Sequence, residues 1–175
     1  MNYVILGKSG SGKTEIAKIM TEEFRYDKIV TYTTRPMRDG EVDGIDYYFV
    51  SVDEFLKMQE NGELVESFLA KNGWFYGTKK DSFNHNDMLI ILTPSGLEKL
   101  KESNIPVVSF YIEVDDKERY IRQILRGDDI QEIARRSVTD EKDFESISDK
   151  VDFVVENNTS DIWDCVRDIL NRLSK

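Results

Sequence analysis

The run Gly7-Lys8-Ser9-Gly10-Ser11-Gly12-Lys13-Thr14 decides the fold class, because an apolar strand-like stretch precedes it and a helical stretch follows it. It fits the spacing G-x-x-x-x-G-K-[ST], in which glycines let backbone amides curl around the oxygens of a phosphate group. At ordinary residue frequencies, a chance match in this length is roughly 0.5%. The run therefore predicts a phosphate-binding loop between a buried strand and a helix.

Two side chains at the end of this run have specific chemistry. In this pattern the lysine, Lys13, reaches the β- and γ-phosphates of a nucleotide, and the hydroxyl of Thr14 is placed to bind Mg²⁺. The helix that follows adds its free amides and its positive N-terminal dipole. We therefore expect a nucleotide at residues 7–14, with Mg²⁺ as cofactor and Thr14 as its protein ligand.

Short apolar runs alternate with helical stretches along the rest of the chain, which favours an α/β fold with a mostly parallel sheet. The runs at 3–6, 28–32, 88–93, 107–112 and 151–156 predict five buried strands. Helical spacing of apolar residues predicts helices at 14–24 and from about residue 160. Cys165 lies in the apolar stripe of the last helix and is predicted to be a core residue.

Two segments depart from this alternation. Residues 31–80 contain short strand-like pieces at 45–50, 64–69 and 74–77 and a helix at about 52–61, which predict an inserted β-rich lobe. Residues 117–136 are charged and helical, with a break at Gly127-Asp128-Asp129. We therefore predict a core of residues 1–30, 81–116 and 137–175, a lobe of residues 31–80 and a small helical lid of residues 117–136, in one compact unit.

Composition excludes several classes of function. The 175 residues carry a net charge of −10, which repels nucleic-acid backbones, and a single cysteine, which allows no intrachain disulfide. Apolar runs are far shorter than the roughly 20 residues that cross a bilayer, and no export signal is visible. We expect a cytoplasmic protein that binds neither nucleic acid nor membranes and is a monomer or a homodimer.

The stretch from Thr31 to Val50 contains Thr-Thr-Arg-Pro-Met-Arg-Asp-Gly-Glu-Val-Asp-Gly-Ile-Asp-Tyr-Tyr-Phe-Val, and it closely resembles the acceptor-site signature of guanylate kinases. Further matches follow in order at Glu66, Tyr76-Gly77-Thr78, Arg122, Arg126-Gly127, Arg136 and Asn157. The resemblance implies a P-loop nucleoside monophosphate kinase that uses ATP and GMP as substrates. It implies phosphoryl transfer from ATP to GMP, and to dGMP, within purine nucleotide metabolism.

The acceptor side chains are chemically suited to a purine nucleotide. Arg35 and Arg38 are guanidinium forks that can grip one phosphate, and the phenols of Tyr47 and Tyr76 can donate to the same group. A carboxylate such as Glu66 accepts hydrogen bonds only, so it complements the N1–H and amino group of guanine. The resemblance also assigns base reading to Thr31 and Thr78.

The resemblance places the remaining arginines around the transferred phosphates. It implies Lys13, Arg35, Arg122 and Arg136 as catalytic residues, and Arg126 and Asn157 as further contacts of the donor nucleotide. Arg135 is an alternative to Arg136, because the stretch is about one residue shorter than the family pattern. Asn157 alternatively caps the end of its strand.

One strand departs from the family pattern. Guanylate kinases carry Asp-x-Asp where this chain has Ile91 and Thr93, which affects metal and acceptor binding. Thr93 stays a candidate substrate-binding residue, and before Pro94 it is also a good helix N-cap. The departure leaves two alternatives open: a related kinase for another phosphorylated acceptor (another nucleotide or a sugar bisphosphate), or a non-catalytic interaction module.

Overall fold

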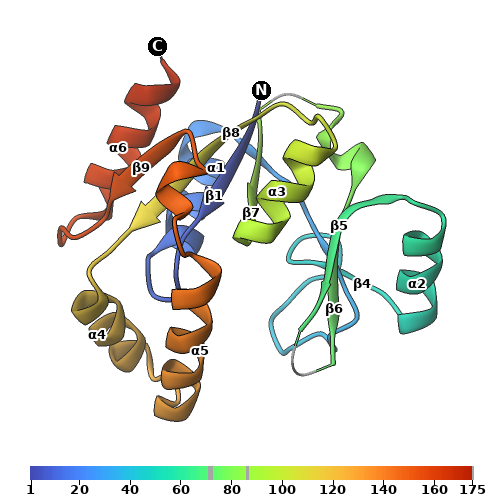
Figure 1. Cartoon of the computed structure of the whole chain (residues 1–175), viewed down its shortest axis with the longest axis horizontal. Coiled ribbons are helices and arrows are strands. Elements are labelled where there is room, and N and C mark those ends of the chain that lie inside the picture. The colour runs from blue at the N-terminus through green and yellow to red at the C-terminus, as the bar shows by residue number, and fades with distance from the viewer. Residues whose placement is uncertain (71–72, 86, 175) are drawn as a thin grey trace.

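The computed structural model describes residues 1–70, 73–85 and 87–174 and contains two sheets (Figure 1). The larger sheet has five parallel strands in the order β2-β7-β1-β8-β9. Its strands are β1 (Asn2–Leu6), β2 (Asp27–Lys28), β7 (Met88–Ile91), β8 (Val107–Glu113) and β9 (Phe153–Glu156). This confirms the α/β fold and the five-stranded parallel sheet expected from the sequence.

The alternation of side chains along β1 explains the layers of the core. Tyr3 and Ile5 pack with α1 (Lys13–Phe24) and α6 (Ile162–Leu173), whereas Val4 and Leu6 pack with α3 (Pro94–Glu102) on the other face. Successive strand residues point to opposite faces, so helices on both sides bury the whole strand. Cys165 lies in the α1–α6 layer as expected, and burial raises the pKa of its thiol to about 12.

The smaller sheet has four strands in the order β4-β3-β6-β5. Its strands are β3 (Tyr32–Thr33), β4 (Tyr48–Phe49), β5 (Leu64–Leu69) and β6 (Phe75–Lys79), with α2 (Val52–Glu60) packed beside β5. Ser51 and Glu54 form the capping box expected at the start of α2. The 3₁₀ turn Lys80–Phe83 leads back toward the core.

Several sequence predictions of strand extent were wrong, among them the strand expected at 88–93, which ends at Ile91. The expected strand at 28–32 is divided, because β2 pairs with β7 of the core and β3 pairs with β6 of the smaller sheet. The expected strand at 45–50 is only Tyr48–Phe49, since residues 42–46 form turns. The expected strand at 151–156 begins at Phe153.

The charged segment forms α4 (Asp116–Arg126) and α5 (Ile130–Asp143), separated at Gly127, which adopts the left-handed conformation. The helix α5 extends seven residues beyond the expected limit at 136, to Asp143. Both helices lie below the core sheet in Figure 1, with α5 between α4 and the smaller sheet. A 3₁₀ turn (Ile147–Asp149) connects α5 to β9. Within the described residues, every helix is too short or too polar to span a bilayer.

Candidate active site

The phosphate loop is the turn between β1 and α1. Gly10 and Gly12 have φ angles of +80° and +87°, which side-chain-bearing residues rarely adopt. A Cβ on Gly7 would lie 2.3 Å from Oγ of Ser11, so the loop is closed tightly on itself. Gly12 is the left-handed residue before α1, whose first turn therefore presents its amides toward the loop.

Helix α4 supports this loop from outside. The guanidinium of Arg119, only 1% exposed, donates to the carbonyl oxygen of Ser9 at 3.0 Å and pairs with Asp116 at 2.5 Å. The side-chain amide of Gln123 donates to Arg119 O at 3.2 Å, and a Cβ on Gly10 would lie 2.6 Å from that same oxygen. The sequence reasoning missed Arg119 and Gln123, although with Arg122 and Arg126 they form an i, i+3, i+4, i+7 set on one face of the helix.

Lys13 is partly buried at the base of the loop, where its ammonium donates to the carbonyl oxygen of Lys8 at 3.3 Å. The pKa of Lys13 is lowered to about 8, mainly by burial and in smaller part by the positive charges of Arg126, Arg136 and Arg119. The carboxylate of Asp140 acts in the opposite direction. Among the described residues no carboxylate forms an ion pair with Lys13, and Asp140 is the acidic group that acts on it most.

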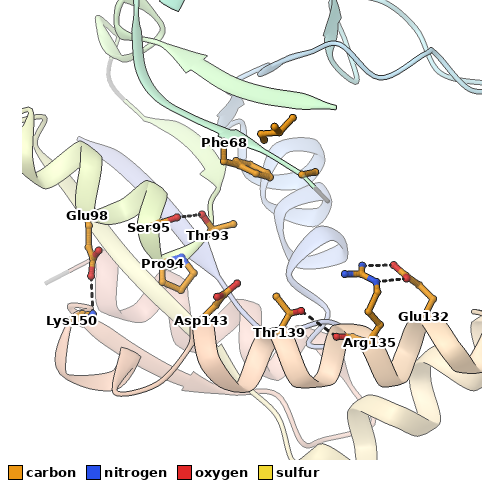
Figure 2. A pocket seen from close by; sticks show the side chains of 12 residues that line it. Phe68, Thr93, Pro94, Ser95, Glu98, Glu132, Arg135, Thr139, Asp143 and Lys150 are labelled. Atoms are coloured by element: carbon orange, nitrogen blue, oxygen red, sulfur yellow. Dashed lines mark hydrogen bonds and ion pairs between the residues drawn. The ribbon is translucent and has the colours of Figure 1, made fainter. Parts of the chain in front are cut away.

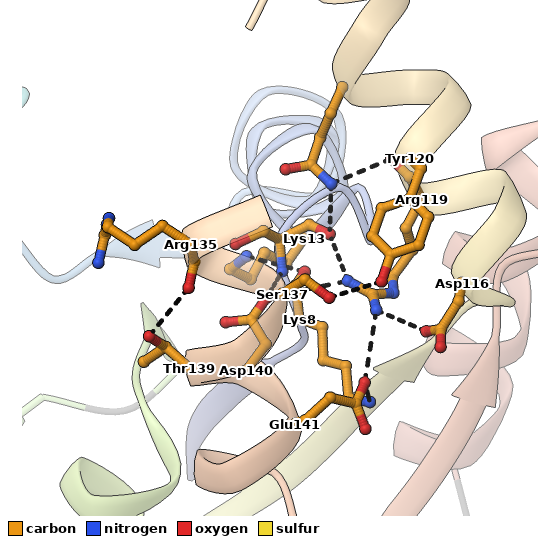
Figure 3. Close-up of polar contacts among 12 residues, drawn as sticks. Lys8, Lys13, Asp116, Arg119, Tyr120, Arg135, Ser137, Thr139, Asp140 and Glu141 are labelled. Carbon is orange, nitrogen blue, oxygen red and sulfur yellow. Dashed lines mark hydrogen bonds and ion pairs between the residues drawn. The ribbon is translucent and has the colours of Figure 1, made fainter. Parts of the chain in front are cut away.

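Two carboxylates of α5 contact the loop (Figure 3). Oδ2 of Asp140 accepts a hydrogen bond from the backbone N–H of Ser9 at 2.6 Å. The carboxylate of Glu141 accepts from Nζ of Lys8 at 2.7 Å. The sequence reasoning assigned no role to either residue, because their segment was placed in the core beyond the end of the expected lid.

Arg122 and Asn157 lie together against the loop. The side-chain amide of Asn157 donates to the carbonyl oxygen of Ser11 at 2.9 Å, and Arg122 donates to the carbonyl oxygen of Asn157 at 2.8 Å. Asn157 is 2% exposed, so this pair joins β9 and α4 to the turn before α1. Both residues therefore lie beside the loop, as expected.

The other arginines of α4 and α5 are more exposed. Arg126 pairs with Asp128, and both Arg135 and Arg136 pair with Glu132. Arg136 lines the cavity that contains Lys13, whereas Arg135 lines a neighbouring cavity. The structure therefore turns Arg136, and not Arg135, toward the phosphate loop.

Beside the smaller sheet, Arg35 is held by hydrogen bonds to nearby residues of the loop that follows β3. The guanidinium donates to the carboxylate of Glu41 at 2.6 Å and to Pro36 O at 2.8 Å, and its plane lies 5.4 Å from the ring centroid of Tyr47. The other carboxylate oxygen of Glu41 accepts from the backbone N–H of Arg38 at 2.7 Å. The hydrogen bond from Arg35 holds the pKa of Glu41 below its ordinary value. Glu41 thus places an anion between the two arginine positions.

Glu66 and Thr78 face each other across the β5–β6 pair. The Thr78 hydroxyl donates to the Glu66 carboxylate at 2.5 Å, and burial raises the pKa of Glu66 although this hydrogen bond opposes the shift. The next pair on the same face, Phe68 and Tyr76, stacks with ring centroids 5.2 Å apart. Tyr76 in turn contacts the ring of Tyr47 at 6.1 Å.

One cavity of about 500 Å³ joins the two halves of the site. Its walls come from the phosphate loop, the smaller sheet and α5, and include Ser9, Lys13, Thr31, Tyr47, Glu66, Tyr76, Arg136 and Asp140. Thr14 lines an adjoining cavity together with Lys13 and Thr31. Outside the phosphate loop, the predicted site residues that do not line the joining cavity are Arg35, Arg38, Thr78, Arg122, Arg126 and Asn157.

A further cavity of about 700 Å³ opens between β5, α3 and α5 (Figure 2). Thr93 lies at its edge, and its hydroxyl accepts from the N–H of Gly96 at 3.2 Å and contacts the Ser95 hydroxyl at 3.0 Å. The N-cap expected at Thr93 is therefore present. Both variant positions, Ile91 and Thr93, also line the joining cavity, where Ile91 provides an apolar wall.

A glycine-rich phosphate loop on a parallel sheet, facing a second polar pocket across one cavity, defines a P-loop nucleotide kinase. The family model for guanylate kinase matches residues 1–173. The chain belongs to the guanylate kinase family and is an enzyme of this type.

Individual guanylate kinases are similar over most of the chain. The protein of Chlamydia felis (strain Fe/C-56) is 30% identical over 164 residues, which are 89% of this chain and 79% of the relative. That of Zymomonas mobilis is 32% identical over 183 residues, covering 98% and 82%. The crystal structure of guanylate kinase from Anaplasma phagocytophilum has a TM-score of 0.69 at 27% identity and covers 99% of this chain and 84% of that chain. The family, the enzyme class and the fold expected from the sequence are confirmed.

Proposed function

We propose that the chain transfers the γ-phosphoryl group of ATP to GMP, and to dGMP, giving ADP and GDP or dGDP. ATP binds on the loop 7–14, and GMP binds against the smaller sheet with its base at Glu66. The single observation that carries the proposal is the joining cavity, because Lys13 and Glu66 line the same space from opposite walls.

The acceptor pocket supports guanine as the base. Ionised Glu66 accepts from both donors of the guanine edge, and the Thr78 hydroxyl, which now donates to Glu66, fixes the carboxylate in place. Burial raises the pKa of Tyr47 above its ordinary value of 10, so its phenol stays protonated and can donate to the acceptor phosphate. Arg35 and Arg38 hold that phosphate once it replaces Glu41 between them.

The donor side supplies positive charge where phosphoryl transfer needs it. Phosphoryl transfer depends on alignment and on neutralising the charge of the migrating group, with little acid–base chemistry. Lys13 lies at the base of the loop, Arg122 is held beside it by Asn157, and Arg136 faces it from α5. Arg126 and Asn157 complete the surroundings of the donor nucleotide.

The residues present fit Mg²⁺ carried in by ATP. The hydroxyl of Thr14 lines a cavity beside Lys13, and no described residue is hydrogen-bonded to it. Mg²⁺ binds phosphates and waters with only one or two protein ligands, so a lone hydroxyl suffices. When bound, the ion neutralises phosphate charge. Among the described residues, no group of three histidine, cysteine or acidic side chains is placed to hold a metal by itself.

We further propose that helices α4 and α5 act as a lid. Closing it over the substrates excludes water, a competing acceptor, and strengthens each arginine–phosphate contact in a lower dielectric. The lid then extends from about residue 116 to 143, not only to 136. A cytoplasmic location and a monomeric or homodimeric state stay predictions.

An acceptor panel tests the proposed function. ADP release is followed with ATP and Mg²⁺ against GMP, dGMP, AMP, CMP and UMP, and turnover is expected with the two guanine nucleotides. Activity confined to another acceptor would overturn the assignment of Glu66, and binding of ATP without turnover on any acceptor would overturn the enzymatic function.

A further inference from the structure

The contact between Asp140 and the phosphate loop has no part in the phosphoryl transfer proposed above. The Asp140 carboxylate is 15% exposed and accepts the backbone N–H of Ser9 at 2.6 Å, within the range of a charge-assisted hydrogen bond. Nη1 of Arg119 lies 3.8 Å from the same carboxylate. The negative charge of Asp140 also raises the pKa of Lys13. An anion thus already occupies part of the loop.

A donor phosphate needs the same surroundings. The loop binds phosphate through backbone N–H groups that point inward, and Ser9 contributes one of them. An N–H that donates to a carboxylate is not free for a phosphate oxygen. Two anions in one place also repel each other, more strongly near a protein surface than in bulk water. The carboxylate and the phosphate therefore exclude each other.

We propose that Asp140 sets the affinity of the loop for the donor. In the unliganded enzyme its carboxylate accepts the hydrogen bond of the Ser9 N–H, and it must move away before a polyphosphate binds. The inference rests on the proposed function of the loop 7–14. It makes Asp140 an internal competitor of the donor, carried on the same helix face as Arg136, four residues earlier. Movement of α5 then exchanges a carboxylate for a phosphate at one amide.

The contact between Asp140 and Ser9 does not depend on the neighbouring ion pair of Glu141 with Lys8. Glu141 pairs with Lys8 at 2.7 Å, but its side chain is more than half exposed, and such pairs contribute little. Arg119 keeps Asp116 and the carbonyl oxygen of Ser9 as partners without Asp140. Removing the charge of Asp140 therefore leaves no buried cation unpaired, and the variant is expected to fold.

The test measures binding, not turnover. The dissociation constants of pyrophosphate and of ADP, each in EDTA and with Mg²⁺, are determined by calorimetry for the wild type and Asp140→Asn. Loss of the competing charge is expected to tighten both ligands about tenfold or more, with the larger gain in EDTA. Asp149→Asn is the matched control, since Asp149 is exposed in the 3₁₀ turn after α5 and does not line the joining cavity, and it should change binding less than twofold.

Other outcomes overturn the inference. Unchanged binding in Asp140→Asn would mean that the carboxylate does not compete, and weaker binding with Mg²⁺ alone would make Asp140 a helper of the metal instead. Absence of binding to the wild type would reject the proposed function itself, so the two failures are distinct. The Ser9 amide resonance gives a second measurement: in the ligand-free protein Asp140→Asn should shift it, because its hydrogen-bond acceptor changes, and an unshifted resonance would contradict the contact.

Discussion

The hydroxyl of Thr78 donates a 2.5 Å hydrogen bond to the carboxylate of Glu66, and both side chains are buried. No cation lies within ion-pair distance of Glu66 among the described residues, so burial raises its pKa with only Thr78 in opposition. A buried carboxylate with a single neutral partner is costly unless a ligand supplies further donors. Guanine supplies two.

Glu66→Gln is expected to raise KM for GMP about 10- to 100-fold while KM for ATP changes less than twofold. The amide presents one donor and one acceptor to an edge that carries two donors, so a buried hydrogen bond is lost and a donor is left unpaired. Steady-state kinetics with each substrate varied in turn measures the effect. Glu63→Gln, at an exposed pair with Lys79, is the control. Equal loss for both substrates would contradict base reading by Glu66.

Arg35→Lys is expected to raise KM for GMP about tenfold or more, although the charge is kept. Lysine lacks the planar fork that Arg35 uses to reach Glu41 and Pro36 O while its face lies near the rings of Tyr47 and Phe49. GMP kinetics and calorimetry provide the measurement. Arg167→Lys, an exposed pair with Asp164, is the control and should behave as wild type. Wild-type affinity in Arg35→Lys would show that the fork does not grip the acceptor.

Lys13→Met is expected to abolish turnover and to stabilise the unliganded protein by about 1 to 3 kcal/mol at pH 7. Burial lowers the pKa of Lys13 to about 8 from 10.5, so the unfolded chain binds more protons between these pH values. Wild-type stability should therefore rise between pH 8 and 10.5 relative to Lys13→Met. Urea unfolding across this range measures the difference, and the exposed Lys99→Met should not show it. A less stable Lys13→Met would mean that the ammonium is well paired in the fold.

Gly10→Ala is expected to lower the free energy of unfolding by about 2 to 4 kcal/mol. The new Cβ would meet the carbonyl oxygen of Arg119 at 2.6 Å, and φ at this position is +80°. Gly62→Ala separates the two causes, because Gly62 has φ +66° with open space around it, and should lose only about 1 kcal/mol. Denaturant unfolding measures both. Equal losses of unfolding free energy in Gly10→Ala and Gly62→Ala would show that the loop is not in close contact with α4.

Local patterns predicted the parts of the structure that local rules control. The loop 7–14, the capping box at Ser51 and the N-cap at Thr93 each depend on residues a few positions apart, and all three are present. The division of the expected strand at 28–32 could not be predicted, since the stretch contains no glycine or proline to mark a break and only the pairing partners separate β2 from β3. Nor could the contact of Asp140 with Ser9, which are 131 positions apart.

Val65, the residue before Glu66, belongs to the buried cluster that also holds Leu97 and Leu100 of α3 and Val4 and Leu6 of β1. The strand that carries the base-reading carboxylate is thus anchored in the interior by its neighbour. Rotating it away would expose a valine and open a void, at a cost of about 1 to 3 kcal/mol. We therefore expect Glu66 to stay at a constant distance from the phosphate loop. Helices α4 and α5 would then make most of the movement that encloses the substrates.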